Sequence, residues 1–233
     1  MIPIYGLQKT TLLDYPGHVA STIFLGRCNF RCPYCQNSSL LDPRDIPPAF
    51  TEEDVYQHLH KRKGILEGVC ITGGEPTLTK DLKNFIKNIK AMGYLVKLDT
   101  NGTNPTMLED LLQENLLDMV AMDIKNSLSR YGTTVGIPGY KTTPIEESVS
   151  LLKNCHIVYE FRTTLVKELH CKEDLLDISQ WLQGNSPYFL QNYKDSDEVL
   201  TKGLQGFNLD ELKSLLAVVK PLLPNASLRG IDH

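Results

Sequence analysis

The sequence predicts an α/β protein built on a parallel sheet, in which six strands alternate with six helices. Three observations support this fold class. Runs of β-branched and apolar residues recur along the chain, a segment of helical periodicity follows each run, and the connections carry glycine, proline or asparagine. Parallel strands need right-handed crossovers, so the sheet is either open and doubly wound or a complete or partial barrel. In both arrangements ligands bind at the carboxyl ends of the strands.

The first half of the chain contains three strand–helix units. The predicted strands are residues 19–25, 68–72 and 94–99. The helices that follow them are residues 51–64, 79–93 and 105–115. Thr51 is a typical N-cap with acidic residues after it, and Gly93 is a typical helix end. Pro105 suits the first helical position after the Asn101-Gly102 turn.

The second half contains three more units. The predicted strands are residues 117–123, 156–164 and 187–192, and the helices are residues 143–152, 173–182 and 209–219. Residues 126–140 are rich in Gly, Ser and Thr, which indicates a loop. Because the chain shows no internal repeat, low-complexity tract or linker, we expect one domain over residues 1–233.

Composition excludes several classes of function. Hydrophobic residues make up 41% and charged residues 22%, as in ordinary globular proteins, and a net charge of -4 offers no basic field for nucleic acid. No apolar run reaches the 18 or so residues of a membrane span, and the first residues lack the pattern of a signal peptide. We therefore expect a cytoplasmic protein without a nucleic-acid or membrane partner.

Three of the six cysteines, Cys28, Cys32 and Cys35, follow the first predicted strand in a C-x3-C-x2-C pattern. Three thiolates can hold one face of a cubane iron-sulfur cluster, which usually takes four cysteines, so one iron would be open to a ligand. The alternative is a structural zinc ion with a fourth ligand such as a histidine. Cys70 lies in an apolar run, which is typical of a small buried side chain.

Polar residues follow the other predicted strands. Gly73-Gly74-Glu75 ends the second strand, Asp99 the third, Asp123 and Lys125 the fourth, and Arg162 lies late in the fifth. Each has a structural interpretation of its own, as a tight turn, a cap or an ion pair. The carboxyl ends of parallel strands meet at one face, so these groups together with the cysteines predict a binding site. Glu75 could accept hydrogen bonds from a ligand ammonium group.

These motifs carry a resemblance to a known superfamily. The cysteine pattern with the aromatic Tyr34 before its last cysteine, followed by Gly-Gly-Glu-Pro at residues 73–76, resembles the radical S-adenosylmethionine (radical SAM) enzymes. Residues 98–102 and 123–125 resemble the activases of glycyl radical enzymes. Residues 6–17 are most similar to the activating proteins of anaerobic ribonucleoside-triphosphate reductases.

The resemblance implies a fold and a set of ligands. The fold is a partial (β/α)6 barrel, TIM-like, with outer helices, and the cofactors are a 4Fe-4S cluster and S-adenosylmethionine at the open iron. Cys28, Cys32 and Cys35 would hold the cluster. The expected contacts of S-adenosylmethionine are Gly73, Gly74 and Glu75 at its amino group, Tyr34 at its adenine, Asn192 or its neighbours on the sixth strand at its ribose, and Asp99, Asp123, Lys125 and Arg162 in the rest of the pocket. A monovalent cation near Asp99, Thr100 and Asp123 is also implied.

The implied activity is oxidoreductase chemistry: reductive cleavage of S-adenosylmethionine gives a 5′-deoxyadenosyl radical, which takes a hydrogen atom from one glycine of a partner protein. The implied partners are an anaerobic ribonucleotide reductase and a flavodoxin or ferredoxin as electron donor. Lys83, Lys87 and Lys90 share one helix face that either docks this donor or is simply solvated. Residues 36–72 contain only Cys70, so a second cluster is not expected. Open alternatives are another glycyl radical enzyme, such as pyruvate formate-lyase, a small-molecule substrate, or a non-catalytic zinc adaptor.

Overall fold

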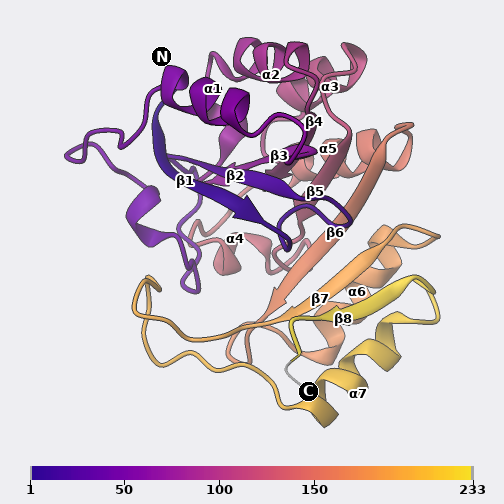
Figure 1. Cartoon of the computed structure of the whole chain (residues 1–233). Coiled ribbons are helices and arrows are strands. Elements are labelled where there is room, and N and C mark those ends of the chain that lie inside the picture. The colour runs from indigo at the N-terminus through magenta and orange to yellow at the C-terminus, as the bar shows by residue number, and fades with distance from the viewer. Residues whose placement is uncertain (1, 232–233) are drawn as a thin grey trace.

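The computed structural model describes residues 2–231 as one eight-stranded sheet whose strands follow in chain order (Figure 1). Strand β1 (Ile4–Thr11) pairs antiparallel with β2 (Ala20–Leu25), and every later pairing is parallel. The remaining strands are β3 (Gly68–Gly73), β4 (Leu95–Thr100), β5 (Met119–Asp123), β6 (Val158–Leu165), β7 (Tyr188–Asn192) and β8 (Ala226–Arg229). Strands β1 and β8 form the two edges, so the sheet is a partial barrel that stays open.

The connections between the strands contain the helices. These are α1 (Glu52–Lys61), α2 (Leu82–Ala91), α3 (Pro105–Gln113), α4 (Tyr131–Thr134), α5 (Thr143–Lys153), α6 (Lys172–Leu182) and α7 (Leu209–Val219). Helix α1 begins with a capping box between Thr51 and Asp54, and α7 with one between Asn208 and Glu211. None of the helices among the described residues is both long and apolar enough to cross a membrane.

All six predicted strands are present, within two residues at each end, and the structure adds two. The second half of β1 has three exposed polar residues, Gln8, Lys9 and Thr10, and β8 has only four residues, so neither shows the apolar run of a buried strand. Helix α2 begins at Leu82, three residues after the expected Thr79 cap, and Thr79 instead ends a 3-10 turn formed by Pro76–Leu78. The loop predicted at residues 126–140 contains the short helix α4.

Strand alternation gives the sheet two different faces. Val96, Leu98 and Val120 lie on the face that packs in the hydrophobic core with the helices. Lys97 and Asp99 alternate with them on β4 and face the inside of the partial barrel, where Arg162 of β6 joins them. Charged side chains thus line the inner face, and the site is built there.

Candidate active site

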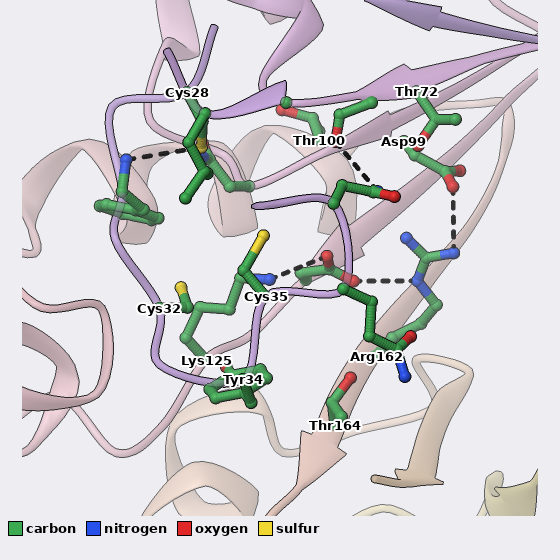
Figure 2. Close-up of a pocket in the computed structure, with 18 of the residues that line it drawn as sticks. Cys28, Cys32, Tyr34, Cys35, Thr72, Asp99, Thr100, Lys125, Arg162 and Thr164 are labelled. Carbon is green, nitrogen blue, oxygen red and sulfur yellow. Dashed lines mark hydrogen bonds and ion pairs between the residues drawn. The ribbon is translucent and has the colours of Figure 1, made fainter. Parts of the chain in front are cut away.

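A cavity of about 260 Å³ opens at the carboxyl ends of the parallel strands (Figure 2). Most of its lining residues come from the cysteine loop and from the ends of β3 to β7: Cys28, Phe30, Cys32, Tyr34, Cys35, Gln36, Asn37, Leu41, Thr72, Gly73, Gly74, Asp99, Thr100, Asn101, Asp123, Lys125, Arg162, Thr164 and Gln191. The structure therefore brings ten of the twelve site residues expected from the sequence into one cavity. Glu75 and Asn192 do not line it.

The three cysteines lie on a loop that the chain holds from several sides. The backbone amide of Arg27 donates to Leu40 O at 2.8 Å, and that of Arg31 donates to Val135 O at 2.9 Å. The guanidinium of Arg31 also donates to Cys28 O at 2.7 Å. These bonds hold the loop just before Cys28 and again between Cys28 and Cys32, and all three thiols line the same cavity (Figure 2).

The surroundings of the thiols fit a thiolate-bound cluster. Burial raises the pKa of Cys28, and it raises the pKa of Cys32 to about 12, although Lys125 opposes the shift at Cys32. These two thiols are therefore neutral without a metal, and a bound metal would displace their protons. Cys28 Sγ accepts from Phe30 N at 3.4 Å and from Asn101 Nδ2 at 3.9 Å, which favours its thiolate. Within residues 2–231, no three His, Cys, Asp or Glu side chains converge as a site for a single ion.

Gly73 and Gly74 bring the end of β3 against the start of the cysteine loop. Gly74 N donates to Leu25 O at 2.8 Å, and Glu75 N donates to Arg27 O at 2.7 Å. A Cβ at Gly74 would lie 2.0 Å from Arg27 O, and Gly73 has a φ of +119°. The sequence interpretation gave Gly74 a close approach to a ligand. In the structure its closest approach is to the backbone of the cysteine loop.

Glu75 lies beneath the cavity and not in its wall. Its carboxylate is fully buried and accepts from Thr77 N at 3.1 Å, Thr100 Oγ1 at 2.7 Å and Asn101 N at 2.6 Å. Burial raises the pKa of Glu75, and these hydrogen bonds oppose the shift. The carboxylate thus joins the end of β3 to the end of β4. The carboxylate of Glu75 does not face the cavity, where a ligand ammonium group was expected to meet it.

Asp99, Asp123, Lys125 and Arg162 form one network of ion pairs across the inner face. Arg162 bridges the two carboxylates, with Nη1 3.3 Å from Asp99 Oδ2 and Nε 3.0 Å from Asp123 Oδ1 (Figure 2). Lys125 Nζ lies 3.0 Å from Asp123 Oδ2. Burial alone would raise the pKa of Asp123, but Arg162 and Lys125 outweigh it and lower the pKa to about 2. Asp123 is therefore ionised at every physiological pH.

Lys97 belongs to the same network, and the sequence interpretation missed it. Its ammonium pairs with Asp99 Oδ1 from two residues earlier on β4. Lys97 is a single lysine within a largely apolar strand, so it belongs to no motif that would indicate a site. The signal that could have identified it is strand parity, because residues two apart on a strand share a face.

Tyr34 lies in the wall of the cavity with its ring edge against His170, at a centroid distance of 6.4 Å. The side chain is buried, and its hydroxyl has no hydrogen-bond partner among the described residues. An unpaired buried hydroxyl is costly in a folded protein, and Tyr34 is the residue that the resemblance expects beside the adenine.

The amide of Asn192 is used elsewhere in the fold. Its Nδ2 donates to Phe207 O at 2.9 Å, and its Oδ1 accepts from Phe207 N at 2.9 Å, which closes the loop between β7 and α7. Gln191, one residue earlier on β7, lines the cavity beside Thr164 of the adjacent strand. Of Asn192 and its neighbours on this strand, Gln191 is therefore the residue that the structure places at the cavity, because adjacent residues of a strand face opposite sides.

The lysines of α2 do not form a free basic face. Lys83 and Lys87 pair with Glu114 at 2.5 and 2.7 Å, and Lys90 pairs with Asp118 at 2.7 Å. Because their charges are neutralised within the chain, this helix offers little attraction to an acidic electron donor.

Comparisons with known proteins bear on this site. The sequence profile of the Radical SAM superfamily matches residues 22–178. A protein of Methanocaldococcus jannaschii, named "Putative glycyl-radical enzyme activating enzyme", is 30% identical over 98% of this chain and 96% of its own length. The 7-carboxy-7-deazaguanine synthase of Neisseria meningitidis serogroup B is 33% identical over 38% of this chain and 39% of its own length.

A solved structure resembles the fold. SuiB of Streptococcus suis superposes with a TM-score of 0.68 and 16% identity, over 88% of this chain and 47% of SuiB. This chain therefore spans about half the length of SuiB. At this identity the likeness establishes a common architecture, the open barrel described above.

Proposed function

The chain belongs to the radical SAM superfamily, and on that premise we propose that it is an activase that installs a glycyl radical on an anaerobic ribonucleoside-triphosphate reductase. The observation that carries the activase assignment is the extent of the match to the M. jannaschii protein, which spans nearly the whole of both chains. By contrast, the sequence match to the 7-carboxy-7-deazaguanine synthase, an enzyme named for a small-molecule product, covers only 38% of this chain. The choice of ribonucleotide reductase rests on the resemblance of residues 6–17.

The shape of the sheet supports a protein substrate. Strands β1 and β8 do not pair with each other, so no closed ring of strands surrounds the cavity at their carboxyl ends (Figure 1). A peptide loop that carries a glycine needs such an opening, because its backbone must reach the centre of the site and leave again. A closed barrel would admit only a small ligand.

A 4Fe-4S cluster with S-adenosylmethionine supplies, when bound, one-electron cleavage of the C5′–S bond and a radical that abstracts the glycine hydrogen. In our proposal Cys28, Cys32 and Cys35 hold the cluster. Lys125 and Arg162 supply positive charge to the wall of the pocket, and Tyr34 offers its free hydroxyl to the adenosyl group. The protein binds and orients these groups and keeps water away from the radical.

The proposal is tested by anaerobic reconstitution, reduction with dithionite and addition of S-adenosylmethionine. We expect about four irons per chain and 5′-deoxyadenosine as product. Cys32→Ser should abolish the product, whereas the matched control Cys155→Ser, outside the cavity, should leave it unchanged. A chain that binds iron and yet yields no 5′-deoxyadenosine would refute the assignment.

The partner is identified in a second assay with two candidate substrates, an anaerobic ribonucleotide reductase and a pyruvate formate-lyase from the same organism. We expect a doublet electron paramagnetic resonance signal on the reductase alone. A doublet on pyruvate formate-lyase alone would keep the activase and replace its partner. Formation of 5′-deoxyadenosine with no signal on either protein would favour a small-molecule substrate.

A further inference from the structure

Lys97 is a buried cation beneath the cavity, with a side chain only 2% exposed. We propose that its ammonium is a tethered counter-ion of Asp99 that takes the place of the monovalent cation implied by the family resemblance. The proposal rests on the proposed function, because it concerns the site for S-adenosylmethionine. Its consequence is that binding of S-adenosylmethionine to this chain does not depend on sodium or potassium.

The oxygens that would bind a cation already have protein partners. In Asp99, Oδ1 forms an ion pair with Lys97 and Oδ2 with Arg162. In Asp123, Oδ1 forms an ion pair with Arg162 and Oδ2 with Lys125. Every oxygen of the two carboxylates therefore contacts a positive side chain. A mobile cation would have to share each oxygen with a lysine or an arginine.

Thr100, the third expected neighbour of a cation, has its hydroxyl in another place. Its Oγ1 donates to Glu75 Oε1 at 2.7 Å and accepts from Gly102 N at 3.1 Å. Neighbouring residues of a strand point to opposite faces, so this hydroxyl lies across β4 from the Asp99 carboxylate. The three expected groups do not form one coordination shell.

The charge balance of the network opposes a further cation. Lys97, Lys125 and Arg162 contribute three positive charges to the two negative charges of Asp99 and Asp123. Adding a sodium or potassium ion would increase this excess positive charge among side chains that already lie within about 3 Å of one another. The excess as it stands suits an anionic group of a bound co-substrate. The residues present thus do not fit a monovalent cation, and they fit Lys97 in its place.

The test compares potassium, sodium and tetramethylammonium chloride at about 0.15 M ionic strength. Dissociation constants of S-adenosylmethionine are measured by anaerobic calorimetry on the reconstituted protein, and melting temperatures are measured on the protein without cluster. For the wild type we expect constants within about twofold of one another in the three salts and no specific change in melting temperature. A dissociation constant that falls in potassium or sodium, relative to tetramethylammonium, would overturn the proposal.

Lys97→Met keeps the length of the side chain and frees one oxygen of Asp99. We expect this variant to bind S-adenosylmethionine about tenfold more weakly in tetramethylammonium, and to recover affinity in potassium or sodium. Its melting temperature should rise by about 2–4 °C in the same exchange. If Lys97 had only a structural role, its replacement by methionine would lower the stability by the same amount in all three salts. A variant that behaves alike in the three salts would therefore also overturn the proposal.

Two further variants make the result independent of folding defects. Lys97→Met/Asp99→Asn removes both charges and should lose the salt dependence again. Lys87→Met, on the outer face of α2, reports any general effect of the salts. If the wild type bound no S-adenosylmethionine in any salt, the proposed function would fail, and the melting temperatures would still decide the role of Lys97.

Discussion

The substitution Gly74→Ala should damage the cysteine loop more than its small size suggests. The added Cβ would lie 2.0 Å from Arg27 O, whereas ordinary contacts of a Cβ begin at 3.4 Å, so the two backbones must separate by about 1.4 Å. That movement breaks the 2.7 Å bond from Glu75 N to Arg27 O. Overpacking and the loss of a buried hydrogen bond together cost roughly 3 kcal/mol.

The cost is measured by urea unfolding of the protein without cluster. A loss of roughly 3 kcal/mol corresponds to a fall in melting temperature of roughly 6–12 °C for a chain of this size. Because Cys28 follows Arg27 directly, the same movement displaces a cluster ligand, so iron bound after reconstitution should also decrease. The stability and the iron content then fall together.

The matched control is Gly93→Ala, which lies after α2 and away from the cavity. Gly93 has a φ of +89° and open space around its Cβ position, so alanine there costs about 1 kcal/mol through backbone strain alone. Its iron content should equal that of the wild type. A Gly74→Ala protein with the stability and iron content of the wild type would refute the steric argument.

Four further substitutions test three residues in the wall of the cavity and Asn192 beside it. Tyr34→Phe removes an unpaired buried hydroxyl, so it should stabilise the unliganded protein by about 1 kcal/mol in urea unfolding and weaken binding of S-adenosylmethionine in calorimetry. Asp123→Asn removes a carboxylate whose pKa is lowered from 3.8 to about 2, so the stability of the wild type relative to this variant is fully present above pH 3.8 and is lost as pH falls through 2. Since this side chain is 32% exposed, the difference at neutral pH is roughly 1–2 kcal/mol. Asn192→Ala should cost about 1–2 kcal/mol in unfolding without changing the affinity, whereas Gln191→Ala should lower the affinity.

Each of these expectations has an outcome that contradicts it. Destabilisation of the unliganded protein by Tyr34→Phe would show that the hydroxyl has a partner after all. A constant stability difference for Asp123→Asn from pH 2 to pH 7 would show that the carboxylate titrates normally. Weaker binding by Asn192→Ala, with normal binding by Gln191→Ala, would restore Asn192 as the contact.

Most of the site could be predicted because it depends on strand ends. The six buried strands can be recognised in the sequence as apolar runs, and the polar residues after them must meet at one face of a parallel sheet. This is why Cys28, Asp99, Asp123 and Arg162 line one cavity as expected. Strands β1 and β8 escaped prediction because edge strands need no continuous apolar run.

The orientation of three side chains could be seen only in the folded structure. Glu75, in a motif that suggested ligand contact, is turned beneath the cavity by four hydrogen bonds from Thr77, Thr100 and Asn101. Gln191 lines the cavity and its neighbour Asn192 does not, because one residue of strand parity decides which side chain faces inward.

The sequence by itself determined the class of this protein, since alternating periodicity imposes a parallel α/β sheet and the cysteine spacing with Gly-Gly-Glu identifies the superfamily. Local chemistry suffices for that, because turn, cap and ligand residues act over a few neighbours. Only the tertiary structure decided which charges neutralise one another. Arg162 reaches Asp99 across 63 residues of sequence, and Lys97 becomes part of the site because β4 and β6 lie on either side of β5. Ion pairs between distant strands depend on register and burial, which no local pattern encodes.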